Sequence, residues 1–338
     1  MTTRGGSGKA WAAAHLFQKD EAPVKDDPRE DEARGSRGID GWLGRLRLGE
    51  SKREGSLEIV ELLGDLDVAQ PAVLLTRQAV ESGVLEIVER GQGVVQELLA
   101  WNKGERPVAI LEGDTLVGCK QNRVVAHSVI VAPGTSLGVP VGCMERGRWR
   151  HETAQFSVGA VKMAPEVRGR TRRDVKAAFL STGERRLDQS RLWRDVDDTL
   201  TACATASPTS DYYEIVKREG RDARERAASL APAPAQVGAI VLADGALVGL
   251  EVAGHHALWS AMAEATLSSY LMGLHRGGSA RRAARAGASD WLSRVQAARV
   301  GTSPGLGLGT DLDLEGPGLA GVGLALGALP LHVAVFPS

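Results

Sequence analysis

Cysteine, aromatic residues and an excess of either charge are all scarce in this chain of 338 residues. Its three cysteines, Cys119, Cys143 and Cys203, contain no Cys-x-x-Cys spacing, so the sequence favours neither a disulfide framework nor a zinc ribbon. Aromatic residues make up only 4% of the chain, and the formal net charge is −1. Such a charge argues against a nucleic-acid surface that covers the whole protein. A hydrophobic content of 43% and a charged content of 25% indicate a globular protein with a sizeable core.

A targeting signal and a clear membrane span are also missing. The apolar patch at residues 10–14 is too short for the core of a signal peptide. Residues 316–336 carry no charge apart from His332 when it is protonated, and their length approaches that of a membrane span. This stretch is rich in glycine and alternates like a strand near its end, so we expect buried strands rather than a membrane anchor. A reducing cytoplasm is the expected location, with no membrane as a partner.

The first 55 residues have the composition of a disordered tail. They are polar and contain runs of mixed charge such as residues 25–32, which bury too little apolar surface to offset the entropy of ordering. One exception is a short amphipathic turn that could dock on the rest of the protein, made of Trp42, Leu43, Leu46 and Leu48.

From residue 57 onwards the pattern predicts a single α+β domain that ends at residue 336. Residues 57–160 read as a β-rich half, in which Pro133-Gly134 turns one apolar strand back on another. Residues 165–230 read as a charged helical segment. Residues 236–336 read as a hairpin, a helix and further strands. The expected fold is an antiparallel β-rich core with helices packed on it.

Two polar segments interrupt the apolar strands of the β-rich half, at residues 112–123 and 143–149. Lysine and arginine there could bind an anion, because the guanidinium fork matches a carboxylate or a phosphate. The neighbouring amides could read a base or a sugar. We therefore expect a binding module for an anionic small molecule, such as a nucleotide derivative, or for a protein partner. The expected ligand-binding residues are Asp114, Lys120, Gln121, Asn122, Arg123, Glu145, Arg148 and Trp149.

An enzyme is the alternative interpretation of the same segments. Glu112 or Glu145 would act as a general base in a hydrolase-like reaction, while Lys120 and Arg123 bind an anionic substrate. A third interpretation is that these carboxylates only pair with the nearby cations and stabilise turns. The three differ in geometry, because a site needs charged groups that converge on an open cleft, whereas a closed network indicates a structural role.

Other chemistries have weaker support in the sequence. Cys143 with His127 or His151 could form a thiol nucleophile and base, but a cysteine in an apolar run is more often inert core. Glu112, Asp114, Glu145 and His127 lack the spacing of a metal site, so no metal is expected and no cofactor is indicated. The basic stretches 162–186 and 276–299 are interpreted as solvated helix faces, so nucleic acid is not an expected partner. Core packing is expected for Trp101, Trp149, Trp193 and Trp259.

Several motifs resemble those of a widespread bacterial domain family. They are Lys120-Gln-Asn-Arg123 within residues 111–125, Cys143-x-Glu-x-Gly-Arg-Trp149, Asp188-Gln189 with Trp193, and Ser207-Pro-Thr209. The family is the ARG and rhodanese-phosphatase-superfamily-associated protein domain. The resemblance covers about residues 57–336 and implies the extent of the domain, but it implies no particular reaction. Cys119 stands where a small residue such as glycine is expected, and the basic stretch 276–288 is an insertion.

Overall fold

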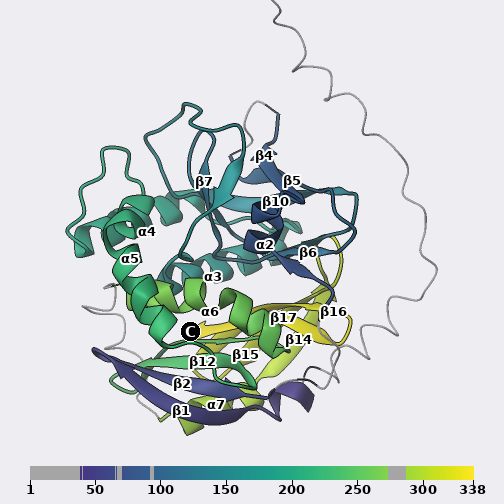
Figure 1. Ribbon diagram of the computed structural model, residues 1–338, viewed down its shortest axis with the longest axis vertical. Helices are drawn as coiled ribbons and strands as arrows, with labels where there is room; N and C mark the ends of the chain where they lie inside the picture. The colour runs from purple at the N-terminus through teal and green to yellow at the C-terminus, as the bar shows by residue number, and fades with distance from the viewer. Residues whose placement is uncertain (1–38, 40, 65, 67–70, 92–94, 273–286) are drawn as a thin grey trace, which may run out of the picture.

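An eight-stranded antiparallel sheet forms the lower part of the computed structural model in Figure 1. The structure describes residues 39, 41–64, 66, 71–91, 95–272 and 287–338. In sheet order, the strands are β1 (Arg47–Glu54), β2 (Leu57–Leu63), β12 (Gln236–Ala243), β13 (Ala246–Val252), β17 (Leu329–Pro337), β16 (Leu319–Leu326), β15 (Thr310–Gly316) and β14 (Arg299–Pro304). Strands from both ends of the chain therefore share one sheet.

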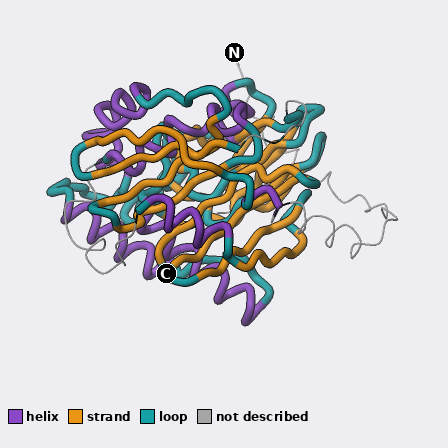
Figure 2. Tube along the Cα trace, turned by 90° about the horizontal axis from the view of Figure 1, so that it is seen from below, coloured by secondary structure: helices purple, strands orange, loops and turns teal. Residues whose placement is uncertain are grey.

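Both faces of this sheet are covered, because its strands are apolar on both sides. In β2, Ile59 points into the core shared with helix α6 (His256–Leu271), while Val60 and Leu62 point into a core on the opposite face. Helix α7 (Ala288–Gln296) supplies residues to that opposite core. Helix α3 (Pro165–Thr182) packs on β13, β16 and β17. Seen from below, strands fill the middle of the molecule and helices lie around them (Figure 2).

The upper part of Figure 1 contains two smaller sheets with a common apolar core. The six-stranded sheet has the order β11 (Phe156–Val158), β7 (Thr115–Gly118), β8 (Arg123–Val125), β10 (Ser136–Cys143), β5 (Glu97–Asn102) and β4 (Leu85–Glu89). The three-stranded sheet has the order β3 (Leu74–Leu75), β6 (Val108–Ile110) and β9 (Val129–Val131). Helix α2 (Thr76–Glu81) follows directly after β3 in the sequence. All pairings are antiparallel except that of β3 with β6. The α+β fold expected from the sequence is confirmed.

Two more helices complete the helical segment predicted for residues 165–230. Helix α4 (Gln189–Ala202) is capped by Asp188, whose Oδ1 accepts the Arg191 N–H at 3.0 Å, and it packs against β10. Helix α5 (Tyr213–Ser229) packs against α6 and joins it to the main core. Helices α3, α4 and α5 therefore all lie within this segment.

The predicted strand reversal at Pro133-Gly134 is also found, with one refinement. Cys143 of β10 pairs with Arg123 of β8, so the two polar segments do meet at one end of the sheet. Between them, β9 leaves the six-stranded sheet and pairs with β6. The apolar run at residues 124–132 thus serves two sheets, which accounts for its burial on both faces.

The predicted disordered tail was too long at its C-terminal end. Strand β1 pairs with β2 over Arg47–Glu54, inside the range 1–55 assigned to the tail. Trp42, Leu43 and Leu46 are buried against β2 and α7, as the predicted docking turn requires. Residues 1–38 of the predicted tail, and the basic stretch from 276 to 286, lie outside the described residues.

At the C-terminus, residues 316–336 form buried strands of the large sheet, as predicted. No helix in the described ranges is long and apolar enough to cross a membrane.

Candidate functional site

The loop between β6 and β7 carries two of the predicted site carboxylates, but cations from distant segments hold both. Lys162 donates to Asp114 Oδ1 at 2.6 Å and to the Glu112 carbonyl at 3.1 Å. Arg168 on α3 donates through Nε to Glu112 Oε2 at 3.2 Å. Gly113 lies between the carboxylates with φ +78°, and a Cβ there would meet Arg168 Nε at 2.5 Å. Only glycine lets the guanidinium lie this close to the turn.

Arg168 is the centre of a buried ionic network that joins the helices to the large sheet. Its Nη1 donates to Glu251 Oε1 of β13 at 2.7 Å. The same carboxylate accepts the Tyr270 hydroxyl at 2.7 Å and lies 2.6 Å from His332 Nε2 of β17. All four side chains are at most 2% exposed. Glu251 is therefore saturated by three partners from three elements.

The electrostatics of this network favour its ionised form. Burial raises the pKa of Glu112, but the Arg168 guanidinium outweighs it, so the pKa lies below its usual value. The pKa of Glu251 is lowered in the same way, against burial, by Arg168 and by its bond to His332. The carboxylates in turn raise the pKa of Arg168 despite the effect of burial. A carboxylate that is held as an anion by a guanidinium is a poor general base.

A second closed network contains most of the other predicted site residues. Arg148 Nε donates to Glu145 at 2.9 Å, and its Nη1 donates to the Cys119 carbonyl at 2.7 Å. Glu145 also accepts the backbone N–H of Asn122 at 3.1 Å. The Asn122 amide donates to Asp211 at 2.9 Å, and its oxygen accepts the Gly118 N–H at 3.0 Å. These bonds tie three loops together, and Asn122, Glu145 and Arg148 are all buried.

Arg123 and Gln121 lie deeper in the same region. Arg123 is 0% exposed and donates through Nη1 to Gln121 at 3.1 Å, while its Nη2 lies 3.7 Å from Glu89 Oε1. Lys120 lies over the ring of Trp149, 5.6 Å from its centroid, and Trp149 is 55% exposed. Trp149 is thus the exposed member of the predicted set, while Lys120 and Asp114 are half-buried.

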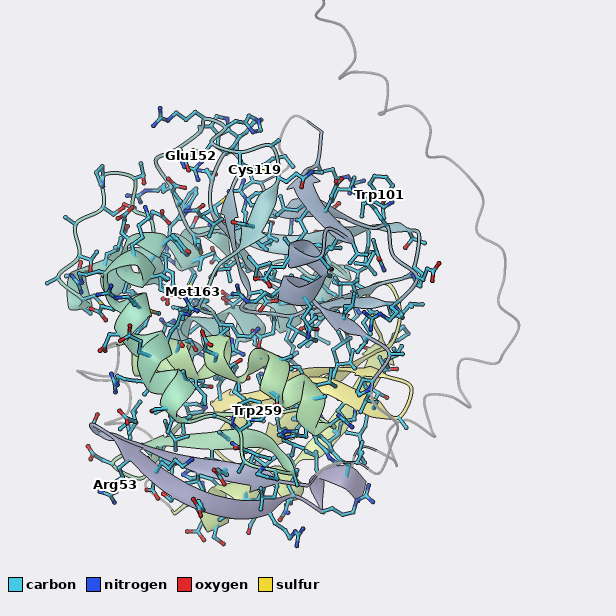
Figure 3. All side chains as sticks on the ribbon, viewed as in Figure 1. Arg53, Trp101, Cys119, Glu152, Met163 and Trp259 are labelled. Carbon is cyan, nitrogen blue, oxygen red and sulfur yellow. The ribbon has the colours of Figure 1, made fainter. Side chains whose placement is uncertain are left out.

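The two polar segments therefore do not converge on one open cleft. Glu112 pairs with Arg168 of α3 and Asp114 pairs with Lys162, whereas Lys120 to Arg123 lie with Glu145 and Arg148. Figure 3 shows Cys119 and Glu152 near the top of the molecule, far from Trp259 of α6 beside the large sheet. The dense hydrogen bonding around Glu145 and Arg148 is typical of a structural role, whereas Nε and Nη2 of the buried Arg123 have no hydrogen-bond partner within the described residues. A role of these residues in ligand binding stays a prediction.

Both thiols of the upper sheet fit the inert interpretation. Burial raises the pKa of Cys119 and that of Cys143 to about 11. A thiol with such a pKa holds little thiolate at neutral pH, and the thiolate is the nucleophile.

A cavity of about 230 Å³ lies elsewhere, between α3 and the strands β14 to β16. The loops that contain Glu112 and His127 close its inner side. Its apolar walls are Ala126, Val175, Phe179, Leu180, Leu312 and Val322. Its charged and polar residues include Arg172, Lys176, Arg185, Asp311 and Asp313. An apolar concave site with a few polar groups is the usual form of a small-molecule site.

The polar groups of the cavity are organised around Asp311 of β15. Its Oδ2 lies 2.9 Å from His127 Nε2 and accepts Arg185 Nε at 2.9 Å. Arg172 donates to Asp313 Oδ1 at 2.6 Å, and Lys176 pairs with Asp313 and Glu315. Lys176 remains 29% exposed in its side chain. The cations at the cavity are thus fixed in position by carboxylates from β15.

Most residues of this cavity and of the buried network were not expected from the sequence to form a site. The stretch 162–186 was interpreted as solvated, yet Lys162 and Arg168 are each 2% exposed and Arg172 is 8% exposed. That prediction was wrong because the counter-ions come from distant strands. One signal in the sequence was that Arg168 and Arg172 share a face of α3 with the apolar Val175 and Phe179, which indicates that this face is packed. Isolated polar residues inside the apolar strands were a second signal, namely Glu251 and His332.

The predicted packing of the tryptophans was correct in part. Trp259 is buried at 0% exposure, but Trp101 and Trp149 are 40% and 55% exposed. Each of the exposed rings is covered on one side by a lysine, Lys103 or Lys120.

A family model describes nearly the whole described fold. The ARG and Rhodanese-Phosphatase-superfamily-associated Protein domain matches residues 45–336, so the chain belongs to that family. The match begins two residues before β1. No curated protein and no solved structure is significantly similar to this chain.

Proposed function

We propose that this member of the family is a binding domain for a small organic anion, which it holds in the cavity between α3 and β14 to β16. The observation that carries the proposal is the combination of apolar walls and fixed cations in one cavity of about 230 Å³. A cavity of about 150 Å³ suffices for benzene. The space therefore suits a ring-sized apolar body with one charged group.

Lys176 and Arg185 are the side chains that would hold the negative group. An arginine has five N–H donors, and Arg185 uses Nε and Nη2 for Asp311 and the Pro304 carbonyl. Lys176 is partly exposed at the same cavity. Carboxylates from β15 hold both side chains in place, so a ligand would find them already oriented, which lowers the entropy cost of binding.

Of the two predicted polar segments, residues 112–123 and 143–149, only Glu112 lines this cavity. The enzyme alternative has less support, because Glu112 and Glu145 are each engaged by a guanidinium. In both pairs the guanidinium occupies carboxylate oxygens that a general base would need for the proton of the substrate.

The test uses benzoate as the anionic probe and benzamide as its neutral counterpart of the same shape. We expect benzoate to raise the melting temperature and to bind, by calorimetry, at least about tenfold more tightly than benzamide, because a charge-assisted hydrogen bond contributes about 1.5–3 kcal/mol. Lys176→Gln should weaken benzoate binding by about tenfold while leaving benzamide unaffected.

Lys217→Gln is the matched control, since Lys217 is also a helical lysine in an ion pair, with Glu214 at 2.7 Å, but lies outside the cavity. Ala126→Leu would fill the cavity without changing its charge and should abolish binding. Equal binding of benzoate and benzamide, or unchanged binding in the Ala126→Leu variant, would refute the proposal.

A further inference from the structure

His127 lines the cavity and has one ring nitrogen without a protein partner within the described residues. The residue is 7% exposed. Its Nε2 lies 2.9 Å from Asp311 Oδ2, whereas Nδ1 makes no hydrogen bond within the described residues. Because the residue lines the cavity, a bound molecule lies within reach of the ring. A polar atom in such a place requires a partner from a bound molecule or from water.

The pairing with Asp311 decides what kind of partner Nδ1 can take. An ionised carboxylate only accepts hydrogen bonds, so Nε2 must carry the hydrogen that lies between the two side chains. In the neutral ring Nδ1 is then an acceptor. Arg185 Nε donates to the same oxygen of Asp311, at 2.9 Å, which holds the carboxylate in its place beside the ring.

We infer that the anion held in this cavity also carries a hydroxyl group, which donates a hydrogen bond to Nδ1 of His127. This inference rests on the proposed function and narrows the ligand to a small hydroxy acid. A hydroxyl group fits better than an ammonium group, because an ammonium would place another cation beside Arg185. An apolar ligand end would instead leave Nδ1 buried without a partner, which costs affinity.

His127 is thus a residue that determines specificity, and the two ends of the ligand are recognised by different side chains. Lys176 and Arg185 bind the acid, the apolar residues of α3 and β15 cover the body, and His127 reads the hydroxyl group. Sites that hydrogen-bond a hydroxyl group discriminate strongly against analogues that lack it, because the protein atom would stay unpaired.

The test compares benzoate with 2-, 3- and 4-hydroxybenzoate by calorimetry, using the full chain. In the wild type, we expect at least one hydroxybenzoate to bind about tenfold more tightly than benzoate. His127→Leu should bring the ratio of the hydroxybenzoate affinity to the benzoate affinity down to about one. His151→Leu is the matched control, because His151 is exposed and lies outside the cavity.

A second measurement does not depend on the folding of a variant. In the wild type with ¹⁵N-labelled histidine, the preferred hydroxybenzoate should shift one Nδ1 resonance and benzoate should not. Equal affinities of benzoate and all three hydroxybenzoates, a preference that survives in His127→Leu, or unchanged Nδ1 resonances would each overturn the inference while leaving the anion site intact. If neither benzoate nor any hydroxybenzoate binds the wild type, the proposed function fails as well.

Discussion

At the scale of single residues, burial separates structural charges from those that a ligand could reach. Glu251 and Arg168 have partners on every side and are closed to solvent. Removing one partner of such a pair leaves an uncompensated charge, whereas the pair itself adds little net stability. Lys176 and His127 differ, since each borders open space. The same residue types thus have opposite roles within one protein.

Asp211 should give this protein a distinct pH dependence. Burial, followed by the nearby Glu145, raises its pKa from 3.8 to about 6, although the backbone N–H of Tyr213 counteracts this. The native state therefore binds the proton more tightly than the unfolded state, and stability falls as the pH rises from about 4 to about 6. The shift corresponds to about 3 kcal/mol.

Asp211→Asn cannot titrate, so its free energy of unfolding relative to wild type should increase by about that amount between pH 4 and pH 7. Urea denaturation at several pH values measures this difference. The value at pH 4, where the wild-type carboxyl is protonated, isolates the cost of the altered hydrogen bonds to Asn122 and Tyr213. A difference that stays constant across the range contradicts the prediction.

At the scale of elements, helix α3 contributes residues both to the buried ionic network and to the cavity. Arg168 binds Glu251 in the buried network. In the following turns of the helix, Arg172, Lys176 and Phe179 line the cavity. Positions 168, 172, 175 and 179 follow the 3.6-residue period, so their side chains lie on one face of the helix. Any ligand in the cavity therefore contacts the same helix that fixes the large sheet.

The turn before β1 belongs to the fold, and Trp42 tests this. Its ring is 1% exposed, and its Nε1 donates to the Gly64 carbonyl at 3.1 Å. Trp42→Ala should cost about 3–5 kcal/mol, because it creates a cavity in the core. Trp149→Ala removes an equally large ring that is 55% exposed and should cost no more than about 1 kcal/mol. Chemical denaturation of both variants measures the loss in the free energy of unfolding. A similarly small loss in both would show that Trp42 lies outside the cooperative core.

At the scale of the whole molecule, the halves of the sequence are interleaved. Strand β2 comes from residues 57–63 but lies between β1 and β12, and the large sheet also takes in β17 at the C-terminus. Lys162 and Arg168 lie beyond residue 160 but neutralise Asp114 and Glu112. A fragment of residues 57–160 would lose the strand partners and the counter-ions together.

We therefore expect the isolated fragment 57–160 to be aggregated or molten. Its β2 would present unpaired edges on both sides, and its buried carboxylates would lack their cations. Circular dichroism and urea unfolding, with residues 39–338 as the comparison, measure this. A soluble fragment with a cooperative transition would show that the predicted single domain is in fact two.

Local features of the fold could be predicted from the sequence because local chemistry determines them. The Asp244-Gly245 turn has φ +50° and +78°, the backbone that a tight hairpin requires, and it joins β12 to β13 where the pattern indicated. The reversal at Pro133-Gly134 likewise brought Arg123 beside Cys143. Turn residues and the period of apolar side chains act over a few positions, and these positions are visible in the sequence.

The candidate site could not be predicted in the same way, because its partners are far apart in the chain. His127 and Asp311 are 184 residues apart, and Arg168 and Glu251 are 83 apart. Only tertiary packing brings these groups together, and packing also decides which charges lose their water. The sequence by itself thus determined strands, turns and helices. Tertiary structure decided which polar residues became a sealed network and which were left facing a cavity.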